Sequence, residues 1–255
     1  EPVVGEPPVV VGPGEVRVRH TGIGVNFVDV YHRIGQLHGD GPVPPFVPGV
    51  QANGIVEAVG TGVSELAIGD RVTHANVGLG SYVAHRVLPA ERLVRVPDEL
   101  ADDLVAASYL RGLTCHYLLK RLYVVKPGDT VLVHAAAGGV GQLMVQWGTR
   151  LGATVIGTVG NERKAEFVRS LGCDHPIVYT REDFAGRVKE ITKGEGVAVV
   201  YDSVGRTTFD GSLRSLRRRG VLASYGEASG DPEPVPPRRL GHLGSIFLTH
   251  PSLPD

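Results

Sequence analysis

The stretch Thr130–Gly141, TVLVHAAAGGVG, decides the fold of this 255-residue chain. It opens with the apolar run Val131–Val133, which is typical of a strand buried on both faces. Small residues follow, and then an apolar helical period that Gly152 is expected to close as a C-terminal cap. A strand, a glycine turn and a helix in this order predict the start of a dinucleotide-binding unit, because the helix N-terminus offers free N–H groups to phosphate.

The glycine pattern of this unit is incomplete, since Ala136 occupies the first of its three usual glycine positions. Gly138 is expected to let the backbone approach a pyrophosphate, and Gly141 to let the helix pack closely on the strand. The alternative is a small-residue turn in an ordinary sheet protein. The regular alternation of strands and helices that follows favours the dinucleotide unit, because it predicts a parallel sheet with helices on both faces.

The tip of the next strand bears on the choice of cofactor. Ala153–Val159, ATVIGTV, has the pattern of a second buried strand, and an Asp or Glu at its end would bind the ribose 2′-hydroxyl of NAD. Gly160 and Asn161 stand there instead, and Arg163 and Lys164 follow. This pattern predicts a site for the 2′-phosphate of NADPH with Lys164 as its ligand, the alternative being two cations on a solvated helix face.

The first part of the chain has a different pattern. Short strands with frequent Gly and Pro predict a small, irregular β-barrel-like domain over residues 1–110, followed by the dinucleotide-binding domain over 111–255. Thr180 and Asp183 resemble a capping box at the start of one helix. The expected helices are 101–123, 140–151, 162–171, one opening at 180, and 207–218; the expected strands after residue 110 are 130–135, 153–159, 176–179, 197–202 and 221–225.

Composition excludes several classes of function. The formal net charge of −1 gives no general attraction to nucleic acid or to an anionic membrane. No apolar run approaches the ~20 residues that a membrane-spanning helix needs, and no signal peptide is visible. Cys115 and Cys173 lack metal-binding or redox spacing, which favours a reducing cytoplasm. Because the chain starts at Glu1 and stops just after an apolar run, we expect it to be part of a longer protein.

Five short motifs together resemble one superfamily. They are Gly24–Asp29 (GVNFVD), Gly69–Val72 (GDRV), Gly112–Thr114 (GLT), His134–Gly141 (HAAAGGVG) and Val200–Gly205 (VYDSVG). The chain resembles the medium-chain dehydrogenase/reductase superfamily, and within it the zeta-crystallin-like NADPH:quinone oxidoreductases. The resemblance implies a GroES-like N-terminal domain, a doubly wound Rossmann-type domain and a C-terminal segment that returns to the first domain. It also implies a homodimer, because Thr249–Leu253 (THPSL) resembles the family's strand at the dimer interface, and we expect the dimer to form through the region Ser245–Thr249.

Zinc-dependent alcohol dehydrogenases share this fold, so the residues at their ligand positions matter. Asn26, the pair Val50–Gln51, and Leu110 stand where Cys, His and acidic ligands would be. None of these side chains replaces a thiolate or an imidazole, and the histidines do not cluster at ligand spacing. The sequence therefore predicts chemistry without a metal. Gln51 also differs from the Glu that quinone reductases usually carry there.

The resemblance further implies roles for individual residues. Asn26, Tyr31 and Thr114 would form the catalytic end, with Asn26 and Thr114 also binding cofactor; the alternatives are helix-face packing for Tyr31 and a surface hydroxyl for Thr114. Gly138, Gly139, Val140 and Gly141 would bind the pyrophosphate. Gly160, Lys164 and Tyr179 would surround the 2′-phosphate, unless Tyr179 is ordinary strand packing. Three residues just beyond strand ends complete the cofactor set, namely Ser203, Gly226 and Glu227. Glu227 differs from the neutral residue common in the family, and the alternative for it is a solvated side chain.

Other reactive residues fit structural roles better. His134 and the pair Asp202–Ser203 suggest nucleophilic chemistry, but no G-x-S-x-G turn is present and a buried, hydrogen-bonded histidine is expected at a strand end. Arg217–Arg219 are expected at a helix C-terminus, where cations are favourable. The function predicted is the transfer of reducing equivalents from NADPH to a quinone. The alternatives are an enoyl or alkenal (C=C) reductase, and a non-catalytic NADPH-binding protein of crystallin-like or RNA-binding type.

Overall fold

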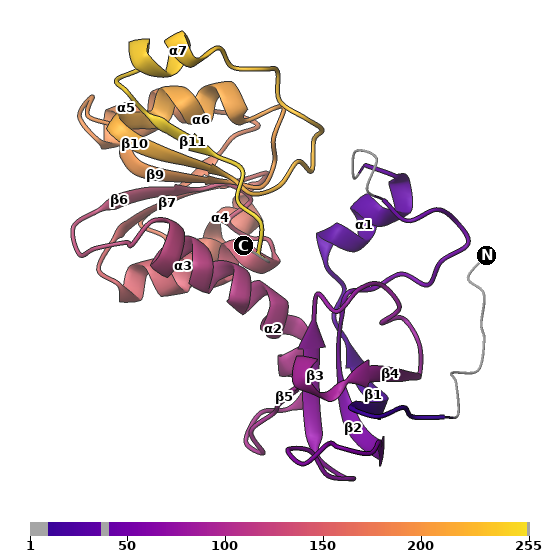
Figure 1. The fold of residues 1–255 in the computed structure, drawn as a ribbon. Helices are drawn as coiled ribbons and strands as arrows, with labels where there is room; N and C mark the ends of the chain where they lie inside the picture. The colour runs from indigo at the N-terminus through magenta and orange to yellow at the C-terminus, as the bar shows by residue number, and fades with distance from the viewer. Residues whose placement is uncertain (1–9, 37–40, 254–255) are drawn as a thin grey trace. The chain divides into compact units, whose positions relative to one another are not determined.

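A computed structural model describes residues 10–36 and 41–253 of the chain. The chain divides into two compact units, residues 1–110 and 111–255, and Figure 1 shows the elements of each. We describe each unit by itself. No helix among the described residues is long and apolar enough to cross a membrane.

The first unit is built on an antiparallel five-stranded sheet with the strand order β4-β1-β2-β3-β5. Its core contains Val16, Val18, Val56, Leu66 and Val72. The register between β1 and β2 shifts between Arg17 and Val18 and again between His20 and Gly22. Such irregularities bend strands and are expected in an irregular barrel. The elements are β1 (Glu15–Ile23), α1 (Phe27–Ile34), β2 (Gln51–Val59), β3 (Arg71–Ala75), β4 (His85–Pro89), the short helix η1 (Ala90–Arg92) and β5 (Val94–Arg95).

The second unit is a parallel six-stranded sheet with the strand order β11-β10-β9-β6-β7-β8. Helix α2 (Asp102–Tyr117) leads into it and ends in a π-helical turn, η2 (Leu118–Leu122). The remaining elements are β6 (Thr130–Val133), α3 (Gly139–Arg150), β7 (Thr154–Val159), α4 (Glu162–Ser170), β8 (His175–Val178), α5 (Phe184–Ile191), β9 (Val197–Asp202), α6 (Phe209–Ser215), β10 (Leu216–Ser224), α7 (Pro237–His242) and β11 (Phe247–Thr249).

Helices cover both faces of this parallel sheet, as the sequence predicts. Val131 and Val133 pack in one core cluster with Met144 of α3. Leu132 points to the opposite face and packs in a second cluster with Leu213 of α6. Successive residues of a strand point to opposite faces, so a strand covered on both sides is apolar throughout. The pattern of β6 therefore follows directly from its central place.

Two local expectations are wrong. The helix expected over 207–218 ends at Ser215, and Arg217–Arg219 lie on β10 rather than at a helix C-terminus. Leu216 is buried and pairs with Val197 of β9, so its burial starts the strand early; the register then shifts before Val221. The strand expected over 221–225 is accordingly longer, Leu216–Ser224.

The second wrong expectation concerns the capping box at the start of α5. The helix begins at Phe184, and the Asp183 carboxylate accepts hydrogen bonds from the amides of Ala185 and Gly186. Thr180 does not cap this helix, because its hydroxyl donates to the Gly160 carbonyl at the end of β7. A single aspartate N-cap thus replaces the predicted pair.

Candidate functional site

The turn between β6 and α3 brings backbone very close to backbone. Gly138 is the N-cap of α3, and its amide donates to the Ala135 carbonyl at 2.7 Å. A Cβ atom on Gly141 would overlap the Ala135 carbonyl oxygen and lie 2.8 Å from Ala136 Cα. Helix and strand therefore pack too closely at Gly141 for any side chain, and the N-terminus of α3 is fixed directly above the strand end.

The alanine in the first glycine position has a partner across the sheet. A Cβ atom on Gly157 of β7 would lie 2.8 Å from the Cβ atom of Ala136, which is fully buried. The methyl group of Ala136 fits because its neighbour on β7 has no side chain. The incomplete glycine pattern therefore preserves the tight turn, since the missing glycine is compensated at Gly157.

A cavity of about 560 Å³ lies at the carboxyl ends of β6, β7 and β9. Such an edge, next to the N-terminus of a helix, is where open α/β sheets bind ligands. None of the described residues that line it is acidic. The lining residues are Ala135, Ala137, Gly138, Thr158, Val159, Gly160, Lys164, Tyr179, Phe184, Val204, Thr207 and Thr208.

Four of the cofactor residues predicted from the sequence line this cavity: Gly138, Gly160, Lys164 and Tyr179. Asn161 caps α4 by accepting from the Lys164 amide at 3.0 Å, which puts Lys164 in the first turn of that helix. Gly160 lies against the tyrosine, since a Cβ atom there would be 3.3 Å from the Tyr179 hydroxyl. The structure thus brings the predicted 2′-phosphate residues together in the lining of one cavity.

The other predicted cofactor residues lie outside the lining. Gly139, Val140 and Gly141 form the first turn of α3. Ser203 and Gly226 lie beyond β9 and β10 and touch each other, because a Cβ atom on Gly226 would be 3.1 Å from the Ser203 carbonyl oxygen. The Glu227 carboxylate lies 3.7 Å from His250 Nδ1.

Several lining residues escape a reading of the sequence. Val204, Thr207 and Thr208 belong to the turn after β9, and Phe184 begins α5. The signal that could have found the turn is its place directly after a buried strand of a parallel sheet. Thr158 has no such signal, because it lies inside β7 and is buried.

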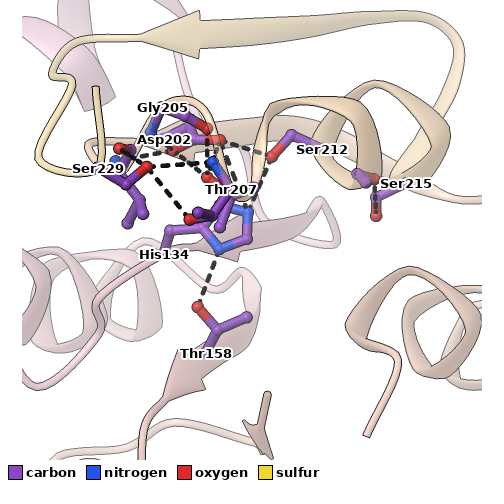
Figure 2. A network of polar contacts seen from close by, with 11 residues as sticks. His134, Thr158, Asp202, Gly205, Thr207, Ser212, Ser215 and Ser229 are labelled. Carbon is purple, nitrogen blue, oxygen red and sulfur yellow. Dashed lines mark hydrogen bonds and ion pairs between the residues drawn. The ribbon is translucent and has the colours of Figure 1, made fainter. Parts of the chain in front are cut away.

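A buried polar network lies beside the cavity (Figure 2). His134 is fully buried, and its ring contacts Thr158 Oγ1 through Nδ1 and Ser212 Oγ through Nε2, both at 2.9 Å. Ser212 in turn donates to Asp202 Oδ2 at 2.7 Å. Burial lowers the pKa of His134, against the opposing effect of the Asp202 carboxylate. The expectation of a hydrogen-bonded core histidine is therefore confirmed.

In the first unit, Asn26 takes part in a second polar cluster. Its backbone amide donates to Asp29 Oδ2 at 2.8 Å, and the Tyr82 hydroxyl donates to the same oxygen at 2.9 Å. Burial is the main cause that raises the pKa of Tyr82 to about 12, and the hydrogen bond to Asp29 is the second. Tyr82 is thus a weak acid near neutral pH. Tyr31 lies on α1 with its ring 5.1 Å from that of Phe27, and Thr114 lies on α2 within the second unit.

The residues at the would-be zinc position do not fit a metal. The Asn26 amide donates to Gln51 Oε1 at 2.9 Å, and Gln51 Nε2 donates to the Ala106 carbonyl at 3.0 Å. Val50 and Leu110 are buried hydrophobic side chains. Over residues 10–36 and 41–253, no three His, Cys, Asp or Glu side chains gather as a metal site would require. The two side-chain amides are hydrogen-bonded to each other at the position where a zinc site would need ligands to a cation.

Comparison with known proteins agrees with this architecture. The family model described as alcohol dehydrogenase GroES-like domain matches residues 12–98, and the one described as zinc-binding dehydrogenase matches residues 139–250. The 2-haloacrylate reductase of a Burkholderia species is 51% identical over 257 residues, which are 98% of this chain and 75% of that protein. The quinone oxidoreductase of Salmonella typhimurium is 44% identical, over 94% of this chain and 72% of its own length.

A solved structure extends the likeness to the whole fold. The Escherichia coli quinone oxidoreductase complexed with NADPH has a TM-score of 0.93 and 42% sequence identity, and the match covers 98% of this chain and 76% of that one. Both units, the glycine turn and the identity over most of the chain point the same way. The chain belongs to the quinone oxidoreductases of the medium-chain dehydrogenase/reductase superfamily.

Proposed function

We propose that this protein transfers reducing equivalents from NADPH to a quinone without zinc, with residues 1–110 as the catalytic domain and 111–255 as the cofactor domain. The observation that carries the proposal is the cavity at the glycine turn. Lys164 lines it, and none of its described lining residues is an acid that would repel a 2′-phosphate. The relative crystallised with NADPH supports the same cofactor.

Each group in the proposal has a physical task. The reduced nicotinamide supplies the electrons when NADPH is bound. The N-terminus of α3 binds the pyrophosphate through its N–H groups, and Lys164 binds the 2′-phosphate as a cation. Asn26, Tyr31 and Thr114 orient the nicotinamide and the substrate. Since a quinone is easily reduced and its oxygens take protons from water, no side-chain acid is needed, in keeping with the high pKa of Tyr82.

The test is steady-state oxidation of NADPH by the purified protein with a small quinone, followed by the loss of NADPH absorbance. We expect sustained turnover. Turnover would exclude the reading as a purely non-catalytic NADPH-binding protein, whereas NADPH binding without any turnover would favour it.

A second candidate function is the reduction of an activated C=C bond. The 51% identity to a 2-haloacrylate reductase favours it specifically. Its substrates are acrylates, enones and related electrophiles rather than quinones. A panel of one quinone, one enone and one 2-haloacrylate separates the two candidates by their kcat/KM values.

Tyr31→Phe tests how protons are delivered. If the site mainly orients the reactants, the variant should lose less than about tenfold in kcat with a quinone, since general acid catalysis is typically worth ~10²–10⁴-fold. A larger loss is expected with an enone, because protonation at carbon benefits more from a placed acid. The measurement is kcat for one quinone and one enone at saturating NADPH. A collapse above about a hundredfold with the quinone would contradict the proposal.

Metal removal gives a further expected result. Because Asn26 and Gln51 bond to each other at the would-be metal position, chelation should leave the activity unchanged. Elemental analysis of the purified protein should find no stoichiometric zinc. Activity lost on chelation and restored by zinc would overturn this part of the proposal.

We also propose a homodimer formed through the region Ser245–Thr249, as the family resemblance implies. β11 is an edge strand of the sheet, and its Phe247 side chain is 58% exposed. An exposed edge strand pairs readily with a second copy. Light scattering should give a dimer that Phe247→Lys dissociates, while Phe167→Lys on the exposed side of α4 should not. A wild-type monomer would contradict this.

A reducing, cytoplasmic location accompanies this proposal. Cys115 and Cys173 are both buried free thiols. Burial raises their pKa values, to about 12 for Cys115 and about 11 for Cys173, so neither is a reactive thiolate. Unpaired buried thiols of this kind suit a compartment where disulfides are not formed.

A further inference from the structure

His134 connects β7 and α5, which both line the cavity, with helix α6. Its ring bonds to Thr158 of β7, bonds to Ser212 of α6, and packs edge-on against Phe184 of α5 with ring centroids 4.9 Å apart. Thr158 and Phe184 are lining residues themselves. One buried side chain therefore contacts β7 and α5, which form two walls of the cavity, and α6, the helix that follows the turn after β9. It sets the spacing between these three elements.

The hydrogen bonds of this network all point the same way, from donor to acceptor. The Asp202 carboxylate only accepts, so Ser212 gives its hydroxyl hydrogen to Asp202 and accepts from His134 Nε2–H. With a lowered pKa the ring is neutral, so Nδ1 carries no hydrogen and accepts from the Thr158 hydroxyl. The order from Thr158 through His134 and Ser212 to Asp202 is thus fixed (Figure 2).

The Asp202 carboxylate connects this hydrogen-bond chain to the cavity wall. It accepts from the backbone amides of Val204 at 2.8 Å and Gly205 at 3.1 Å, and from the Thr208 hydroxyl at 2.8 Å. Val204 and Thr208 line the cavity. The wall formed by the turn after β9 is therefore positioned by the same carboxylate that ends the hydrogen-bond chain.

A serine holds this turn from its other side. Ser229 Oγ donates to the Val204 carbonyl at 2.7 Å and accepts from the Thr207 amide at 3.0 Å. Figure 2 shows Asp202 and Ser229 together around the turn. With both sides bonded, the wall has little freedom of its own, and its position depends on where Asp202 is held.

We infer that His134, acting through Ser212 and Asp202, is a positioning residue that sets the cavity wall for NADPH. This inference rests on the proposed function. It assigns His134 no contact with the cofactor and no part in proton transfer to the substrate. Loss of this hydrogen-bond chain lets the turn after β9 shift, and the misplaced contacts then weaken cofactor binding.

Ser212 and Ser215 form a matched pair for the test. Both are fully buried on α6, but Ser215 Oγ donates only to the Gly211 carbonyl of its own helix, apart from the network (Figure 2). Ser212→Ala removes a donor to Asp202 and leaves His134 Nε2–H without its acceptor. Ser212→Ala should raise the Kd for NADPH about tenfold, whereas Ser215→Ala should change this Kd less than about twofold. The two variants should have similar midpoints of thermal unfolding. NADPH fluorescence titration gives the Kd without turnover.

Variants of His134 supply the rescue experiment. His134→Phe fills the same space without hydrogen bonds and should weaken NADPH binding at least as much as Ser212→Ala. His134→Gln keeps an N–H donor toward Ser212 and should recover part of the affinity. Equal Kd changes in the Ser212 and Ser215 variants, or equal changes in the Phe and Gln variants, would overturn the inference alone. A wild-type protein that does not bind NADPH would overturn the proposed function as well.

Discussion

Gly141→Ala should destabilise the protein by about 3 kcal/mol, which is the upper end of the usual cost of overpacking a core. It should also weaken NADPH binding by at least about tenfold. A Cβ atom at this position overlaps the Ala135 carbonyl oxygen and lies 2.8 Å from both Cα and O of Ala136. All of these atoms are backbone, so no side chain can turn away to make room. Relief requires α3 to move off β6, which also moves its N-terminus away from the phosphates.

Gly241→Ala is the matched control. Gly241 lies in α7, and a Cβ atom there meets nothing within 4 Å. This substitution should be neutral or slightly stabilising, because alanine is the better helix former. Thermal unfolding and NADPH titration of both variants measure the difference. A Gly141→Ala protein with wild-type stability and affinity would show that α3 does not need this close packing.

Lys164→Ala should narrow the preference for NADPH over NADH by at least about tenfold, since a charge-assisted hydrogen bond to phosphate is worth about 1.5–3 kcal/mol. The Kd for NADPH rises in this variant while the Kd for NADH stays nearly constant, because NADH has no 2′-phosphate. Lys164 is exposed, so the wild-type preference should also fall as salt is added. Binding titrations with both cofactors at two salt concentrations give these numbers.

The neighbouring cation serves as the control for Lys164. Arg163 lies beside it on α4 but does not line the cavity, so Arg163→Ala should leave the preference within about twofold. Equal loss in both variants would indicate a general field of positive charge rather than a specific contact. Equal affinity of the wild-type protein for NADPH and NADH would contradict the assignment of this pocket.

The sequence alone predicts the parallel sheet well, because the evidence is local. An apolar run such as Val131–Val133 identifies a strand covered on both faces, and the small residues that follow identify the turn. Lys164 could likewise be placed near one strand tip from its distance along the chain, whereas the place of Tyr179 beside it comes from the family resemblance. These features depend on a few neighbouring residues, and the structure keeps them together at the cavity.

The rest depends on contacts between distant segments. Ala136 tolerates its methyl group because Gly157 faces it, which no single motif reveals. Thr158 and Val204 meet at one cavity because β6 pairs with both β7 and β9. The helix expected through Arg217–Arg219 fails for a similar reason, since pairing of Leu216 with Val197 outweighs local helix preference.

The strand order of the second unit has a consequence for its unfolding. β6 lies between β7 and β9, so the cavity takes lining residues from the half of the sheet that contains β7 and β8 and from the half that contains β9 and β10. A dinucleotide bound there contacts both halves, and separation of either half releases it. At a concentration of a hundred times its Kd, such a ligand adds about 2.7 kcal/mol to the free energy of unfolding. Resistance of this domain to proteolysis in the cell would then follow the supply of NADPH.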